Sequence, residues 1–176
     1  MVPWREFVAA APELAATGEG LLFQFGVGLA FLATVRKDGG PRLHPVCPVL
    51  SHGRLYVLII PTSPKQQDLL RDGRYALQTF PQPKPDSAEF YLTGRADLIE
   101  DTRLRRAVLN DAKHKVHESE ILFELKVGRV MHTTWEGWGR RNSGLSTANG
   151  TLLRGKGRHR GRSCIFHPWP MFAGRW

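Results

Sequence analysis

The 176-residue sequence predicts a mainly β fold: a small barrel, closed or partly split, of six antiparallel strands with an N-terminal helix and two short peripheral helices. Six runs of apolar and β-branched residues are separated by turn residues, and the helical segments between them are few. The length is about that of one domain, which can close a hydrophobic core without disulfides or metals. Together these observations indicate one β-rich domain.

Each expected element has its own local signal. Apolar residues recur at helical spacing over 4–15, and Pro12 should limit or kink this N-terminal helix. Two short helices are expected over 63–71 and from residue 101 or 102 onward. The expected strands cover residues 29–35, 42–50, 54–60, 75–80, 89–99 and 121–135.

The second expected strand, 42–50, contains two prolines. Pro45 and Pro48 have no backbone N–H to donate to a neighbouring strand. We therefore expect this strand to be an edge, to be bulged, or to be paired on one side only. Its remaining backbone groups would then be available to contact a ligand.

Charge divides the chain into two parts. Residues 1–136 contain 17 Lys and Arg residues and all 16 Asp and Glu residues, so their net charge is +1. Residues 137–176 contain eight basic residues, eight glycines and no acidic residue. We interpret 1–136 as the folded domain and 137–176 as a basic Gly/Arg-rich tail, expected to be mostly disordered. The high overall charge thus belongs to the tail.

The same composition narrows the expected partners and location. The basic run 154–162 contains no interleaved aromatic residues, so we expect nonspecific, salt-sensitive contact with polyanions and no specific nucleic-acid partner. No apolar run approaches the roughly 20 residues that span a bilayer, and the start of the chain lacks the layout of a signal peptide. Cys47 and Cys164 match neither a zinc site nor a disulfide framework. A cytoplasmic protein without membrane contact or a metal site is expected.

The start of the 63–71 helix carries the strongest chemical signal. Ser63 fits the N-cap, Pro64 the first helical position and Gln66 the third, which would complete a capping box. Lys65 opposes the helix dipole in this first turn, and a bound anion would reverse that effect. Together with the hydroxyls of Thr62 and Ser63, it could form a phosphate site. A plain capped helix with an exposed lysine remains the alternative.

Two basic residues lie nearby in the pattern. Arg42 and His44 are two positions apart on a strand, so their side chains share one face. If that face meets the helix start, Arg42 adds a charged fork for a phosphate or a ring carbonyl. In the alternative reading, the strand is a solvated edge on which Arg42 pairs with an Asp or Glu.

The order of motifs resembles a known family. Residues 31–46, 53–57, 63–77 and 90–96 follow one another as in the pyridoxamine 5'-phosphate oxidase-like proteins, which are FMN-binding split barrels. The resemblance covers roughly residues 20–135. It implies a homodimer with two flavin sites at the subunit interface and an FMN-dependent oxidoreductase acting on a small organic substrate. The implied cofactor-binding residues are Arg42, His44, Pro45, Val46, Thr62, Ser63, Lys65 and Trp135.

The resemblance also implies a role for each of these residues. Lys65 and Ser63 would hold the FMN phosphate with Thr62 nearby, and Arg42 would reach the phosphate or the ribityl chain. The backbone of 44–46 would run along the isoalloxazine ring, and Trp135 would flank that ring. The chain after Trp135 departs from the ending of true pyridoxamine oxidases, which carries their substrate-phosphate residues.

Several alternatives stay open at this point. The fold also holds a deazaflavin analogue in some members and haem in others, with His44 as a candidate haem ligand. A deazaflavin-dependent reductase, or a flavin- or haem-binding protein without turnover, is therefore an alternative function. Hydride transfer through a flavin needs no side-chain acid or base, so no catalytic residue is predicted.

Overall fold

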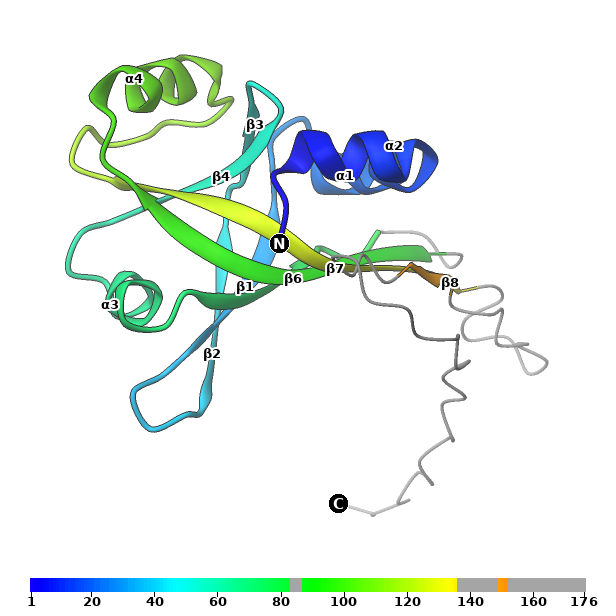
Figure 1. Cartoon of the computed structure of the whole chain (residues 1–176), viewed down its shortest axis with the longest axis horizontal. Coiled ribbons are helices and arrows are strands. Elements are labelled where there is room, and N and C mark those ends of the chain that lie inside the picture. The colour runs from blue at the N-terminus through cyan, green and yellow to red at the C-terminus, as the bar shows by residue number, and fades with distance from the viewer. Residues whose placement is uncertain (83–86, 136–148, 152–176) are drawn as a thin grey trace, which may run out of the picture.

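A computed structural model describes residues 1–82, 87–135 and 149–151. The helices are α1 (Trp4–Ala10), α2 (Pro12–Leu22), α3 (Pro64–Arg71) and α4 (Thr102–Asp111). The strands are β1 (Ala30–Val35), β2 (Pro41–Val46), β3 (Val49–Ser51), β4 (Arg54–Ile59), β5 (Arg74–Thr79), β6 (Ser87–Ile99), β7 (Ile121–Trp135) and β8 (Asn149–Thr151). The mainly β prediction is confirmed (Figure 1).

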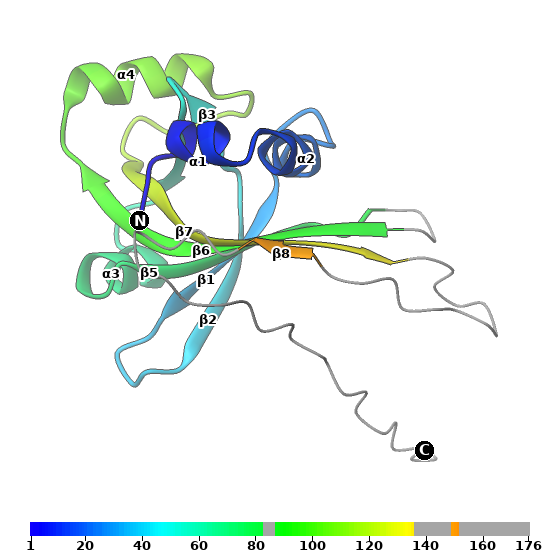
Figure 2. The same ribbon diagram turned by 45° about the vertical axis from the view of Figure 1, so that its right-hand side comes forward.

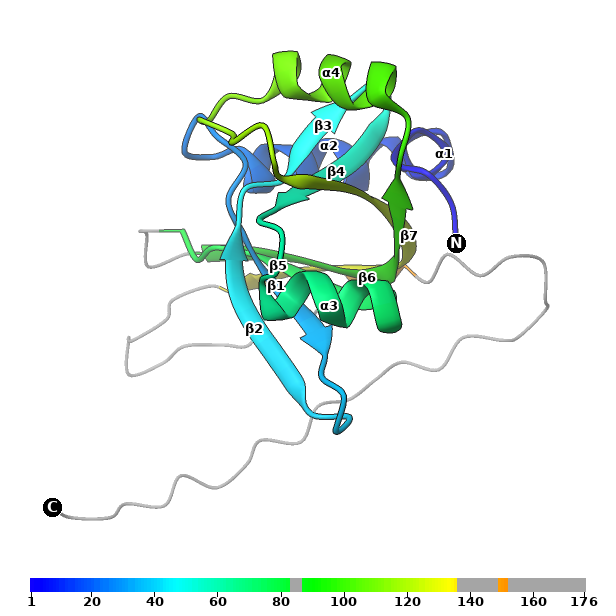
Figure 3. The same ribbon diagram turned by 90° about the vertical axis from the view of Figure 1, so that its left-hand side faces the viewer.

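The strands form one antiparallel sheet in the order β2-β1-β5-β6-β7-β4-β3, with β8 on β7. The sheet curls on itself, as the end-on view of Figure 3 shows. The sheet order places β2 at one end and β3 at the other, although only two residues separate them in the chain. The two edges of the sheet are therefore connected here by two residues of chain and not by strand pairing. This gap in the pairing makes the barrel a split barrel.

The prediction of one strand over 42–50 is wrong, because the structure has two strands there, β2 and β3. Cys47 and Pro48 interrupt it, since Pro48 has no N–H for the ladder. Within the described residues β2 pairs with β1 alone and β3 with β4 alone. The prediction of one-sided pairing is confirmed.

The N-terminal helix is likewise two helices rather than one. Ala11 lies between them with φ −150° and ψ 68°, outside the helical region. A residue before proline is pushed out of the α conformation, so Pro12 ends α1 and starts α2. Both helices lie over the same side of the sheet (Figure 2), where Trp4 and Phe7 pack edge-on or tilted against Phe90.

Two apolar clusters stabilise the molecule. The main cluster fills the barrel and the layer under α1 and α2, with Leu32, Leu77 and Leu92 among its fully buried members. The second cluster lies outside the barrel, where Val108 of α4 packs against Tyr56 of β4 and its neighbours. Helix α3 contacts β1 and β6 instead, and Figure 3 shows it on the opposite side of the ring from α4.

The three residues of β8 lie inside the segment expected to be a tail. They pair with Val130–His132 of β7, so this short piece belongs to the sheet. The rest of 137–176 lies outside the described residues, and the prediction of disorder there stays a prediction.

Candidate functional site

Strand β2 directs alternate side chains to the two faces of the sheet. Arg42 and His44 are half-buried, whereas Leu43 between them is 62% exposed. Arg42 lies opposite Thr34 of β1 and His44 opposite Leu32, and both β1 residues are buried. The two basic side chains thus share the inner face of the curled sheet, as their spacing predicted.

The start of α3 is built largely as predicted. Ser63 is the N-cap, and its Oγ accepts a hydrogen bond from Gln66 N at 3.4 Å. The reciprocal contact differs from a capping box, because Gln66 Oε1 accepts from Thr62 N (3.2 Å) instead of from Ser63 N. Thr62 has φ +66°, a left-handed conformation that is rare for a β-branched residue. The hydrogen bond that Thr62 N donates to Gln66 therefore holds a strained turn at the helix start.

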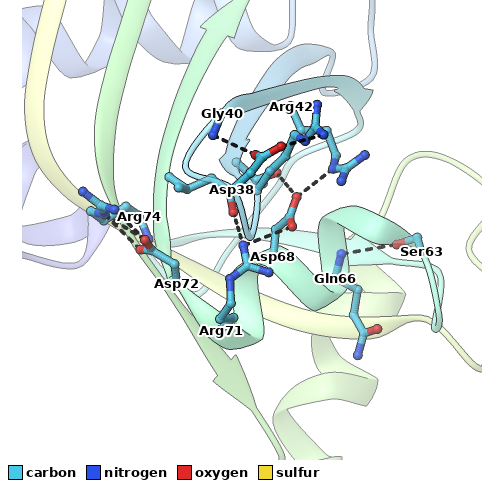
Figure 4. A network of polar contacts seen from close by, with 12 residues as sticks. Asp38, Gly40, Arg42, Ser63, Gln66, Asp68, Arg71, Asp72 and Arg74 are labelled. Atoms are coloured by element: carbon cyan, nitrogen blue, oxygen red, sulfur yellow. Dashed lines mark hydrogen bonds and ion pairs between the residues drawn. The ribbon is translucent and has the colours of Figure 1, made fainter.

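Arg42 meets α3 through a buried carboxylate. Asp68 of α3 is 3% exposed, and its Oδ2 accepts from Arg42 Nε at 2.7 Å and from Thr34 Oγ1 at 2.9 Å. Its other oxygen accepts from Arg71 at 3.2 Å. Figure 4 shows Asp68 between the two arginines. Arg71 also donates to the carbonyl of Val35, so this network ties α3 to β1 and β2.

These contacts keep Asp68 ionised. Burial alone would raise the pKa of the Asp68 carboxyl, but the hydrogen bonds from Arg42, Thr34 and Arg71 outweigh it and lower that pKa below its ordinary value. The carboxylate is therefore a permanent negative charge at neutral pH.

The ion pair uses only one nitrogen of Arg42. Its Nε donates to Asp68, and among the described residues its two terminal nitrogens have no hydrogen-bond partner. The side chain remains 29% exposed. Arg42 therefore pairs with an Asp, as in the prediction of a solvated edge strand. Its two terminal nitrogens remain available to a ligand, as the prediction of a phosphate site requires.

His44 is the unsatisfied group of this site. Its Nε2 is buried and has no hydrogen-bond partner in the described part of the chain. Burial lowers the pKa of His44 first, the charges of Lys65 and Arg42 lower it further, and Asp68 opposes them. His44 is thus neutral at pH 7, with a nitrogen free to bond a ligand.

The cluster as a whole carries an excess of positive charge. Arg42 and Arg71 both bond to one buried carboxylate, Asp68, and Lys65 adds a third positive charge in the first turn of the same helix. Such a surplus beside a helix N-terminus attracts an anion, and a phosphate fits the arginine fork, the ammonium and the Ser63 hydroxyl.

The remaining predicted residues lie at or beyond the edge of this cluster. Val46 is buried in the main core and Pro45 is exposed on the outer face, so only their backbone could border a ligand. Trp135 is the last residue of β7, opposite Ser87 of β6, and its side chain lies outside the described residues.

Sequence reasoning missed Asp68, Thr34 and Arg71. The spacing of Asp68 and Arg71, three apart on a helix, was a readable signal for an ion pair. Their link to Arg42 was not readable, because it joins segments 26 residues apart.

Other features lie away from this cluster. A cavity of about 160 Å³ is bordered by Phe23 just after α2, Leu50 of β3 and Asp111 of α4, and none of the predicted site residues lines it. Within the described ranges, no three His, Cys, Asp or Glu residues are grouped so that they could hold a metal ion. No helix in that part is both long and apolar enough to cross a membrane.

Comparison with known proteins identifies the fold. The sequence matches no protein-family model, and no curated protein matches it. Among solved structures, a heme-binding protein from Mycobacterium smegmatis superposes with a TM-score of 0.57 and 22% identity, over 78% of this chain and 57% of that protein. A Listeria innocua protein assigned as a pyridoxamine 5'-phosphate oxidase gives 0.51 and 19%, over 65% of this chain and 94% of that one.

A third structure, HupZ from group A Streptococcus, gives a TM-score of 0.56 at 14% identity, over 66% of this chain and 91% of that one. All three sequence identities are low, so the comparisons show a shared fold and do not establish a shared function. The chain has the split-barrel fold of the pyridoxamine 5'-phosphate oxidase-like proteins.

Proposed function

We propose that this protein binds FMN and acts as an FMN-dependent oxidoreductase on a small organic substrate. The observation that carries the proposal is the ion pair between Arg42 of β2 and Asp68 of α3, which ties the strand that carries Arg42 and His44 to the helix that begins with Ser63 and Lys65. The surplus charge of the cluster, its free arginine fork and the unpartnered Nε2 of His44 fit a phosphorylated ligand.

In this proposal the phosphate is held from two elements. Lys65 and the Ser63 hydroxyl bind it at the helix start, and the fork of Arg42 binds it from β2. Thr62 precedes them in a strained turn, and backbone strain of this kind is often found at ligand-binding sites. Because Arg42 donates to Asp68 through Nε, its terminal nitrogens stay free, and the phosphate would not compete with the ion pair.

The ring would lie along β2. Within the described residues this strand has a partner on one side only, so along residues 44–46 the backbone groups that point away from β1 are open, and Pro45 has only its C=O to offer. Neutral His44 could donate or accept one hydrogen bond at Nε2. The flavin, when bound, supplies the two-electron redox chemistry, while these residues bind and orient it.

The proposal includes a homodimer. The outer face of the sheet carries apolar side chains across several strands: Leu43 is 62% and Met131 37% exposed, beside half-buried Phe31 and Tyr91. A second copy covering this face would bury them.

Light scattering tests the homodimer: the measured mass should be twice the 19.8 kDa chain mass, and Leu43→Glu should shift it towards that of one chain. Leu70→Glu, on the exposed side of α3, is the matched control. A monomer at micromolar concentration would contradict the proposal.

A second candidate ligand rests on His44. An imidazole with an unpartnered nitrogen can bind haem iron, and one structural neighbour is described as a heme-binding protein. A deazaflavin, which also carries a phosphate, shares the argument for Lys65. The absorption spectrum of freshly purified protein separates the three ligands, because their bands differ. Titration of the apoprotein with each ligand should show the tightest binding for FMN, and tighter binding of haem or deazaflavin would refute the proposal.

A further inference from the structure

The bond between Asp68 and Arg42 has an uncommon form. An arginine usually meets a carboxylate with two parallel N–H groups, which occupies its fork. Here the carboxylate takes Nε of Arg42 at 2.7 Å, and no described residue bonds the terminal nitrogens. The contact therefore fixes the direction of the guanidinium without using the atoms that would recognise a phosphate.

Asp68 is itself held rigidly. Thr34 donates to the same oxygen at 2.9 Å and Arg71 to the other at 3.2 Å, and the carboxylate is 3% exposed. Its position is thus set by β1 and by its own helix. Because it stands in the same helix as Lys65, it also fixes Arg42 relative to the start of α3.

We infer that Asp68 is a positioning residue for the phosphate site: it aims the fork of Arg42 at the anion that Lys65 and Ser63 bind. This inference rests on the proposed function. Without Asp68, the arginine would be free to turn into solvent, and ordering it on binding would cost side-chain entropy.

Charge alone predicts the opposite effect. Asp68 is a negative charge near the proposed anion, so removing it would strengthen phosphate binding if only Coulomb attraction mattered. Positioning predicts weaker binding. The sign of the change therefore separates the two roles.

The experiment compares FMN with riboflavin, the same ring system without the phosphate. The ratio of the riboflavin Kd to the FMN Kd measures phosphate recognition alone, and a general loss of structure would not select for it. In Asp68→Asn, which keeps the shape but removes the charge, the ratio should fall about tenfold or more, as expected when a charged hydrogen bond is lost. In the Arg42→Gln background, Asp68→Asn should change the ratio little.

Asp72→Asn is the matched control, because it removes a carboxylate at the end of the same helix that pairs with Arg74 instead of Arg42, and it should leave the ratio close to that of the wild type. Thermal unfolding of each apoprotein is recorded first. If Asp68→Asn does not fold, Asp68→Glu decides the question: it keeps the charge, moves the carboxylate by one methylene and should also lower the ratio.

The outcomes separate the two claims. A wild-type protein with no preference for FMN over riboflavin refutes the phosphate site and hence the proposed function. A clear preference that Asp68→Asn leaves unchanged or increases refutes the positioning role alone. An equal fall of the ratio with and without Arg42 also refutes the positioning role, because the effect of Asp68 would then not pass through that arginine.

Discussion

The sharpest test of the proposed site is Lys65→Ala. Lys65 is half-buried at the second position of α3, beside the Ser63 N-cap, and its charge reaches His44. In the proposed complex it makes one charge-assisted hydrogen bond to the phosphate, worth about 1.5–3 kcal/mol. FMN binding should therefore weaken by roughly 10- to 150-fold.

The apoprotein should behave differently from the complex. A cation in the first turn opposes the helix dipole, so its removal should leave the free energy of unfolding unchanged or raise it by about 0.3–1 kcal/mol. Fluorescence titration with FMN and riboflavin measures binding, and thermal unfolding of the apoprotein measures stability. Riboflavin affinity should hardly change.

Lys37→Ala is the matched control. Lys37 is exposed in the turn between β1 and β2, and its loss should affect neither ligand. Unchanged FMN affinity in Lys65→Ala would refute the phosphate assignment. An equal loss for FMN and riboflavin would show that Lys65 acts on the ring or the fold instead.

Three further predictions concern stability. The pKa of His44 is lowered in the folded protein, so the unfolded chain binds the proton more readily. The stability of the apoprotein, measured by thermal unfolding, should therefore fall as the pH drops below about 6.5. His44→Gln should make stability less dependent on pH in this range. Tyr56→Phe should be neutral or stabilising by up to about 1 kcal/mol in urea unfolding, because the Tyr56 hydroxyl is buried without a partner among the described residues; a loss above that size would reveal a partner. Gly18→Ala should destabilise by about 1–3 kcal/mol because its Cβ would lie 2.3 Å from the Phe90 ring, whereas Gly20→Ala, with nothing within 4 Å, should stabilise α2 by about 0.5–1 kcal/mol; similar effects of the two substitutions would contradict this packing.

Local chemistry was enough to predict much of the fold. The strands follow from apolar runs between turn residues, and one-sided pairing near Pro45 follows from missing N–H groups. The start of α3 was readable because Ser63 and Pro64 each suit one position at a helix N-terminus. These signals need only neighbouring residues, so a sequence displays them directly.

The same local signals stopped short at the breaks. Pro12 was expected to limit or kink one helix, yet the structure has two, and the run 42–50 is two strands on opposite ends of the sheet. A proline shows where regular structure is weakened. Whether the chain bends or changes partner there depends on what the segments on each side pack against.

The candidate site shows most clearly which features follow from the sequence and which depend on tertiary packing. Arg42, His44 and Lys65 were nominated from residue type and spacing, but their meeting depends on how β2 and α3 pack together. Asp68 was not nominated at all, because a helical aspartate usually lies in solvent and only the tertiary fold buries this one beside Arg42. The sequence by itself determined which charges are available. The tertiary structure decided which of them share a low-dielectric environment, and that environment determines whether a charge is neutralised or left to bind a ligand.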